Sequence, residues 1–152
     1  MNKYLLLLMI LVLFACNDDR SSDRGAASTK WFDTDTLLVW DADASNESRK
    51  KIYQPEDSIP IIQPVINGIN QVWPEGQLKI ENLKNDTLYV RPANSEWVTE
   101  KIGDTGAEQY LSFAAMNLLE VKGVRLVCFS LPEGSHATSS CWSQEDFRDW
   151  KE

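Results

Sequence analysis

The chain has 152 residues, a formal net charge of −8 and a sequence pI near 4.7. Its 15 basic residues are outnumbered by 23 acidic ones, and the only cationic cluster, Arg49, Lys50 and Lys51, stands in a polar stretch. Binding to a nucleic-acid backbone requires a basic surface, so this charge balance disfavours nucleic acid as a partner. Once an N-terminal leader is set aside, the length suits one small domain.

The chain begins like a secretory signal peptide. Lys3 supplies a positive charge, and residues 4–15 are an unbroken apolar run that is too short and too weakly flanked to be a spanning helix. The run ends in Leu13-Phe14-Ala15-Cys16, which resembles the lipobox of bacterial lipoproteins, whose cysteine receives lipid and becomes the new N-terminus. We therefore expect residues 1–15 to be a lipoprotein signal peptide and Cys16 to be the lipidation site.

The lipid would anchor the protein without a spanning segment, because each buried CH₂ of an acyl chain contributes about 0.8 kcal/mol and two chains attach stably. The alternatives are an ordinary signal peptide with an incidental cysteine and an uncleaved anchor. Neither explains why the cysteine stands where the sequence changes abruptly from apolar to polar, at Asn17. The acidic residues after Cys16 also resemble the export signal of lipoproteins in the Bacteroidota. That resemblance implies the outer membrane, with periplasmic exposure and surface display both open.

Residues 16–30 are polar and rich in Ser, Gly, Ala and Asp, so we expect a disordered tether. The folded part then begins near Trp31. We divide it into a domain over residues 31–130 and a C-terminal loop and short helix over residues 131–152 that packs on the domain.

The first expected strand covers residues 36–40, a β-branched and aromatic run. It enters a polar loop that we expect to last to about Ser58. Pro64 suits a first helical turn, and apolar residues follow it at helical spacing at positions 65, 66, 69 and 72. The sequence therefore predicts a short helix that Pro74 ends.

A β-hairpin is expected next. Residues 77–83 and 87–91 carry apolar positions on either side of Lys84, Asn85 and Asp86, a polar triplet that favours a turn. The two runs therefore predict a pair of antiparallel strands.

The strongest local pattern is Thr105-Gly106-Ala107-Glu108, a candidate capping box in which Thr105 would be the N-cap. Apolar positions then recur at intervals of three and four: Ala107, Tyr110, Leu111, Ala114, Ala115, Leu118 and Leu119. They predict one apolar face of a helix that Gly123 terminates. The apolar run over residues 124–129 predicts a central strand. Near the chain end, Ser143 and Asp146 form a second candidate cap, with Phe147 and Trp150 on one face.

Cysteine usage is typical of an oxidising compartment. With Cys16 assigned to lipid, Cys128 and Cys141 remain as an even pair, which makes a disulfide between them a candidate. Because Cys128 lies in an apolar run, a buried free thiol that behaves as a small hydrophobe is the alternative. The sequence has no CxxC motif, no Cys/His zinc spacing and a single histidine, so we expect no metal and no cofactor.

The chain has six tryptophans, many for a domain of this size. Trp40 lies in an apolar run and is expected in the core. The others stand at element edges, where a large amphipathic ring either covers a small core or forms part of a binding surface. The tryptophans that make up our candidate binding surface are Trp73, Trp97, Trp142 and Trp150.

The order of strand, helix, hairpin, long helix and strand over residues 36–129, with the turn Glu120-Val121-Lys122-Gly123-Val124, resembles a GerMN-type domain of the sporulation and spore germination family. The resemblance implies an α+β fold in which two helices pack on one face of a mixed, mostly antiparallel sheet. It also implies a non-catalytic protein that acts outside the cytoplasmic membrane. It provides no ligand-binding residue and no counterpart for the segment after residue 130.

The polar residues that could act in catalysis do not form a recognisable catalytic pattern. Ser135, Ser139 and Ser140 surround the lone His136, but no nucleophile elbow or ordered triad framework is present. The pairs Asp33/Asp35 and Asp41/Asp43 are ordinary in an acidic chain. The start of a calcium loop at Asp41 lacks the glycine at the sixth position and the glutamate at the twelfth. We therefore expect no catalytic residue.

Two functions of different class remain open. The first is a lipid-anchored interaction module that offers a sheet edge or its tryptophan-bearing rim to another envelope protein. The second is a lipoprotein that binds glycan or peptidoglycan through exposed aromatic rings. Sugar stacking needs two or more exposed coplanar rings, whereas protein docking needs a contiguous apolar patch.

Overall fold

The structure is a computed structural model that describes residues 36–53 and 60–152. The chain divides into the units Met1–Lys30 and Trp31–Glu152, and every described residue belongs to the second unit. The expected signal peptide, Cys16 and the tether lie outside the described residues.

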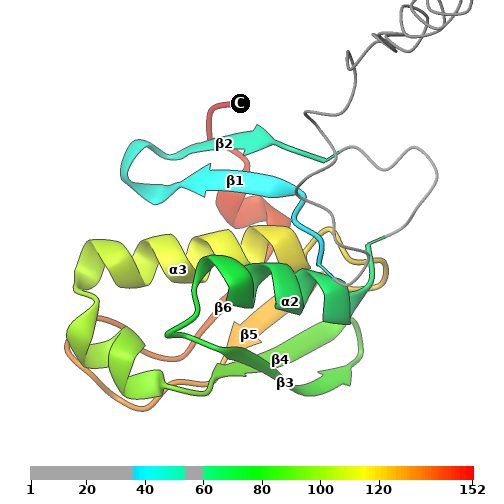
Figure 1. Cartoon of the computed structure of the whole chain (residues 1–152). Coiled ribbons are helices and arrows are strands. Elements are labelled where there is room, and N and C mark those ends of the chain that lie inside the picture. Colours follow the sequence, from blue (N-terminus) through cyan, green and yellow to red (C-terminus); the bar gives the residue numbers. More distant parts are fainter. Residues whose placement is uncertain (1–35, 54–59) are drawn as a thin grey trace, which may run out of the picture. The chain divides into compact units, whose positions relative to one another are not determined.

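The described residues form three layers (Figure 1). A four-stranded sheet has the order β3-β4-β5-β6, and two helices cover one of its faces. A hairpin of β1 and β2 lies on the other side of the helices. The strands are β1 (Trp40–Asp43), β2 (Ser48–Lys51), β3 (Leu78–Lys84), β4 (Thr87–Pro92), β5 (Leu126–Phe129) and β6 (Ser140–Trp142). The helices are α2 (Ile62–Val72) and α3 (Asp104–Leu118), with short turns η2 (Ala44–Asn46), η3 (Trp97–Lys101) and η4 (Gln144–Phe147).

The predicted fold class is confirmed. β4 pairs in parallel with β5, while β3 with β4 and β5 with β6 are antiparallel, so the sheet is mixed and mostly antiparallel. Both helices lie on one face of this sheet in a single small α+β domain. The expected central position of β5, between β4 and β6, is also confirmed.

The predicted short helix and β-hairpin are confirmed too. Pro64 stands in the first turn of α2, and the side chain of Asn70 then joins the helix to β3. Its Oδ1 accepts a hydrogen bond from the Leu78 N–H at 2.6 Å, and its Nδ2 donates to the Leu78 carbonyl at 3.1 Å. At the tip of the hairpin, Asn85 and Asp86 both have positive φ, as a type I′ turn requires.

The residues of the predicted apolar face of α3 are all buried, but this is not the only buried face, because from Tyr110 onward the helix is buried on all sides. Every residue from Tyr110 to Leu118 is buried. One side of the helix packs toward the four-stranded sheet and the other toward the β1–β2 hairpin. The sequence pattern showed only the first side, because the second side combines polar Gln109 and Asn117 with apolar Met116.

These two amides act as hydrogen-bonding partners for β1. Asn117 Oδ1 accepts from the N–H groups of Val39 at 2.7 Å and Trp40 at 2.9 Å, and its Nδ2 donates to the Trp40 carbonyl at 3.0 Å. Gln109, two turns earlier on the same side, accepts from the Ala44 N–H at 2.6 Å and donates to the Ala42 carbonyl. The helix therefore satisfies buried backbone groups that a neighbouring strand would otherwise satisfy.

The predicted capping box at Thr105 is also wrong. The N-cap of α3 is Gly103, with φ of +78°, and no side chain caps the helix. Glycine adopts this φ without strain, so the helix begins two residues earlier than expected and Thr105 lies inside its first turn. By contrast, the predicted cap at the chain end is confirmed, because Ser143 and Asp146 form a capping box at η4.

The predicted first strand and loop need correction. β1 begins at Trp40, not at residue 36, and the expected loop contains η2 and β2. Along β1, Trp40 and Ala42 are buried and Asp41 and Asp43 are exposed, which is the alternation of a strand. Alanine is too weakly apolar to reveal that alternation in the sequence. The sequence analysis also did not predict β6, which lies in the expected C-terminal loop and pairs with β5.

Candidate functional site

The proposed lipid anchor cannot be placed, because Cys16 lies outside the described residues. Among the residues that the structure describes, no helix is long and apolar enough to cross a membrane. The assignment of Cys16 as the lipidation site stays a sequence prediction.

The four candidate tryptophans form two separate clusters. In the first, the ring centroids of Trp73 and Trp97 are 6.1 Å apart with the planes tilted by 56°. Both rings meet Tyr110 edge to face, at 5.8 and 5.7 Å. Both tryptophans are partly buried and pack against the core, so they do not present a flat aromatic platform.

The first cluster is tightly packed around Tyr110, which is fully buried. A Cβ atom at Gly76 would come within 2.8 Å of the tyrosine ring, so a larger residue at this position would force the ring to move. Burial raises the pKa of the Tyr110 hydroxyl above its ordinary value. The tyrosine is therefore a neutral core residue.

The second cluster lies in the C-terminal segment, on β6, η4 and the residues just after η4. The rings of Trp142 and Phe147 stack at 5.5 Å with an interplanar angle of 11°, and Trp150 meets Phe147 edge to face at 5.3 Å. Although the rings of Trp142 and Phe147 are nearly parallel, Phe147 is only 1% exposed. In the described structure, the candidate surface therefore lacks two exposed coplanar rings.

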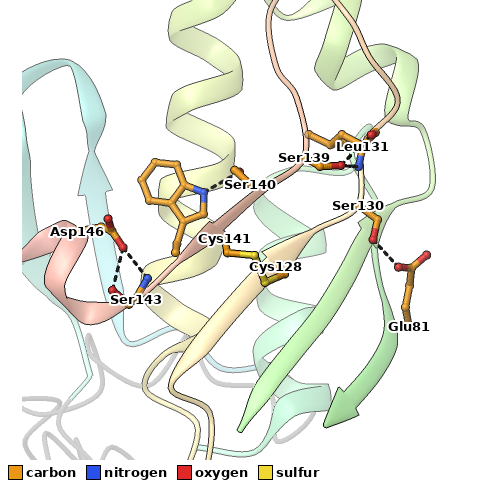
Figure 2. Close-up of a disulfide and its surroundings, with 10 residues drawn as sticks. Glu81, Cys128, Ser130, Leu131, Ser139, Ser140, Cys141, Ser143 and Asp146 are labelled. Atoms are coloured by element: carbon orange, nitrogen blue, oxygen red, sulfur yellow. Dashed lines mark hydrogen bonds between the residues drawn. A yellow bond between two sulfur atoms is a disulfide. The ribbon is translucent and has the colours of Figure 1, made fainter. Parts of the chain in front are cut away.

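Cys128 and Cys141 are joined by a disulfide (Figure 2). The two residues lie directly opposite each other in β5 and β6, with Cα atoms 4.0 Å apart. Cys128 is buried and Cys141 is exposed, so the bond lies at the face of the sheet that the helices leave uncovered. It fastens the short edge strand β6, and with it the C-terminal segment, to the sheet.

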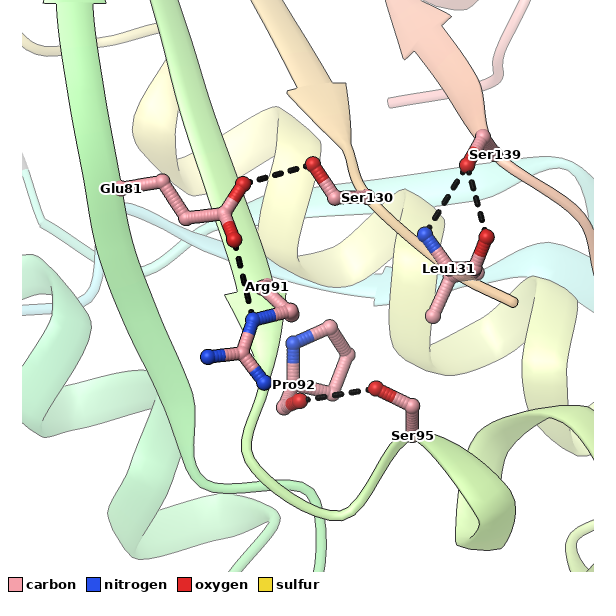
Figure 3. A network of polar contacts seen from close by, with 7 residues as sticks. All are labelled: Glu81, Arg91, Pro92, Ser95, Ser130, Leu131 and Ser139. Atoms are coloured by element: carbon pink, nitrogen blue, oxygen red, sulfur yellow. Dashed lines mark hydrogen bonds and ion pairs between the residues drawn. The ribbon is translucent and has the colours of Figure 1, made fainter.

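The uncovered face also carries a polar network (Figure 3). Glu81 of β3 accepts hydrogen bonds from Ser130 Oγ at 2.6 Å and from Arg91 Nε at 2.9 Å. The Ser130 hydrogen bond and the Arg91 charge lower the pKa of the Glu81 carboxyl below its ordinary value. The network connects side chains from β3, β4 and the end of β5 across this face.

The residues around His136 do not form a catalytic triad. His136 Nδ1 lies 2.7 Å from Asp104 Oδ1, which is the geometry of a base and its orienting carboxylate. Each nearby serine hydroxyl, however, is engaged elsewhere. Ser135 donates to Glu100 at 2.9 Å, Ser139 pairs with the backbone of Leu131, and Ser140 accepts from Trp142 Nε1.

Of the carboxylates considered from the sequence, Asp43 has a local structural role. Asp43 accepts from the Ser45 N–H at 3.0 Å and from Asn46 Nδ2 at 2.6 Å, and so caps η2. Asp33 and Asp35 lie outside the described residues. Within the described ranges, no three or more His, Cys, Asp or Glu side chains are grouped to hold a metal ion.

One hollow brings together residues that the sequence analysis had separated. It measures about 210 Å³ and is lined by Trp40, Arg49, Met116, Leu119, Glu120, Gln144 and Phe147. The Arg49 guanidinium carbon lies 4.8 Å, and Lys51 Nζ 5.1 Å, from the centroid of the Trp40 ring. On the edge of the same ring, Trp40 Nε1 donates to Glu120 Oε1 at 3.0 Å.

The sequence analysis missed this hollow because it placed Trp40 in the core and the cationic cluster in a loop. Period-two alternation, with Arg49 opposite Ala42 and Lys51 opposite Trp40, puts these side chains on one face of the hairpin. The sequence analysis did not predict the β1–β2 hairpin, and without it these side chains could not be placed together.

No family model, no curated protein and no solved structure matches this chain. The resemblance to GerMN-type domains therefore stays a sequence prediction, and the function must be argued from the residues described above.

Proposed function

We propose that this protein is a non-catalytic, lipid-anchored protein of the cell envelope, at the outer membrane, that acts as an interaction module for another envelope protein. The anchor is the lipobox cysteine, Cys16. Confinement of both proteins to one membrane surface raises their effective concentration, so a weak contact suffices.

The observation that carries this proposal is the apolar exposure of the β3–β4 hairpin. Ile80, Leu83 and Tyr89 are 41%, 50% and 38% exposed. They account for three of the six large exposed hydrophobic side chains among the described residues, the others being Ile52, Ile61 and Val72. Ile80 and Leu83 are opposite Val90 and Leu88 and so share one face of the hairpin, whereas Tyr89 alternates to the other face. Scattered exposed apolar residues are ordinary, but two such side chains on one face of an edge strand give the proposed contact its apolar centre.

The contact is proposed to use side chains rather than strand addition. β3 is an edge strand, but its pairing with β4 shifts between Ile80 and Asn82, which interrupts the edge. Lys79 and Lys84 are also exposed there. Bulges and edge lysines are common means of preventing another strand from pairing.

Photo-crosslinking in cells tests this proposal. A photoreactive residue at Leu83 should trap one specific envelope protein, and the Cys16→Ser variant should trap less of it. Ile80→Ser should weaken the crosslink, whereas Ile52→Ser, at a similarly exposed position of 46% outside the hairpin, should not. Equal crosslinking in both isoleucine variants would contradict the assignment of the hairpin.

Glycan binding is the second candidate. The described tryptophans favour it less, because Trp73 and Trp97 are tilted and Phe147 is buried under Trp142. Micromolar binding of a glycan that is lost on Trp97→Ala or Trp142→Ala, without any protein crosslink, would favour this second function.

A further inference from the structure

We propose that the hollow beside Trp40 binds a small zwitterion, a molecule with both a carboxylate and an ammonium group, such as a free amino acid or a short peptide. The proposal goes beyond the interaction function and does not depend on it. It rests on opposite charges that meet around one indole ring at the wall of a hollow.

The hollow has room for a small organic molecule. Its volume of about 210 Å³ corresponds to roughly seven water molecules, at about 30 Å³ each in the liquid. Trp40 and Phe147 contribute aromatic surface, and Met116 and Leu119 contribute aliphatic surface. The accessible part of the lining is mainly polar, which suits a ligand that carries charges.

Arg49 provides the wall for the carboxylate. One guanidinium nitrogen, Nη2, pairs with Glu152 Oε1 at 2.8 Å, while Nε is buried and has no hydrogen-bond partner among the described residues. A guanidinium binds a carboxylate best through two parallel N–H groups. A ligand carboxylate would replace Glu152 at Nη2, and Lys51 adds a second positive charge nearby.

Glu120 provides the wall for the ammonium group. It accepts one hydrogen bond from Trp40 Nε1, and a carboxylate has about four lone-pair sites, so it retains capacity for another donor. Arg49 and Glu120 both contact the Trp40 ring. A ligand with one charge of each sign therefore matches the hollow better than a simple anion, which Glu120 would repel.

Glu152 occupies the position that the carboxylate of the ligand would take. Its side chain is 62% exposed, and exposed ion pairs are weak, so a ligand can displace it. Removal of the Glu152 carboxylate should therefore strengthen ligand binding, whereas changes to Arg49 or Glu120, which would bind the ligand, should weaken ligand binding.

Titration calorimetry of the full chain in detergent tests the ligand class. L-leucine and L-alanyl-L-alanine represent the free amino acid and the peptide. At least one should bind saturably, and the better of the two identifies the source. N-acetyl-L-leucine and L-leucinamide, which each lack one charge, should bind at least about tenfold more weakly than L-leucine, or not at all.

Variants of the chain test the assigned residues. Arg49→Lys keeps the positive charge but loses the paired N–H donors of the guanidinium, and should weaken binding about tenfold. Glu120→Gln removes the negative charge opposite the ammonium group and should also weaken binding of the zwitterion. Glu152→Gln should tighten binding about two- to fivefold. Glu145→Gln, an exposed carboxylate on η4 that does not line the hollow, is the matched control and should change nothing.

The proposal fails if neither zwitterion binds up to about 10 mM, where even millimolar affinity would register. It also fails if Glu152→Gln weakens binding, or if blocking either charge of leucine has no effect. The comparison among ligands needs no substitution, so it remains decisive even where thermal melts show that a variant is unfolded.

Discussion

The side of α3 toward the four-stranded sheet and the side toward the β1–β2 hairpin are held by different interactions. Leu111 and Leu118 are seven residues apart, so they share one face of the helix, about 100° to 120° around its axis from Asn117, and we take this face as the sheet side. On the hairpin side, Gln109 and Asn117 hold the backbone of β1 through hydrogen bonds. Burial of apolar side chains thus holds the sheet against the helix. On the hairpin side, the buried amides also fix the position of the β1 backbone along the helix.

This contrast implies different sensitivities. An apolar contact tolerates another apolar residue of similar volume, because dispersion and burial are not directional. A hydrogen-bonded amide tolerates little, because its loss leaves buried backbone groups without partners. The predictions below separate the two sides by this criterion.

The largest effect is expected from a charge on the sheet side. Leu118→Asp should prevent folding, because an unpaired carboxylate would be buried at a position that is 0% exposed, at a cost of more than about 4 kcal/mol. Circular dichroism and thermal melts measure this. Leu118→Met is the control and should cost less than about 1.5 kcal/mol. A stable Leu118→Asp protein would show that this side of α3 has been misassigned.

The next effect tests the hairpin side. Asn117→Leu conserves volume but removes every hydrogen bond to Val39 and Trp40, and should lower the free energy of unfolding by about 3 kcal/mol. Denaturant unfolding provides the value. Asn82→Leu, at an exposed position on β3, should change stability by no more than about 0.5 kcal/mol. If both substitutions were equally mild, the amides would not be what holds the hairpin.

The disulfide tests how the C-terminal segment is tied to the sheet layer. Cys128 and Cys141 are 13 residues apart, and the chain-entropy account of such a short loop gives about 3 kcal/mol of stabilisation. Thiol titration of denatured, unreduced protein should find neither of these two cysteines free, and reduction should lower the melting temperature. Two free thiols per chain from these positions would remove the cross-link from the account.

The smallest effect concerns the start of α3. Thr105→Ala should change stability by less than about 0.5 kcal/mol, because Thr105 is not the N-cap. Gly103→Ala should cost about 1 kcal/mol or more, since alanine does not readily adopt a φ of +78°. Thermal melts of the two variants compare these positions directly. The reverse order of effects would restore the capping box that the sequence suggested.

These cases show what the sequence could reveal. The α2 helix, the β3–β4 hairpin and β5 follow from local periodicity and turn residues, which act within a few positions of the chain. The hairpin side of α3 does not, because Asn117 forms its hydrogen bonds with residues 77 and 78 positions away. An isolated buried amide has no local pattern that distinguishes it from an exposed one.

The candidate site shows the same limit. Trp40, Arg49 and Glu120 become neighbours only when β1 pairs with β2 and the hairpin packs on α3. The four tryptophans expected as a surface were recognisable as edge residues, but their division into two packed clusters depends on Tyr110 and Phe147. Sequence pattern located the aromatic residues without indicating what each would contact.

The central claim is that Cys16 anchors this interaction module to a membrane, and lipid labelling in cells tests it most directly. With an alkyne-tagged fatty acid, the wild-type chain should become labelled and should remain in carbonate-washed membranes. The Cys16→Ser variant should be unlabelled and should leave the membrane fraction. If that variant still sediments with washed membranes, or if the wild-type chain takes up no label, the lipid anchor is contradicted.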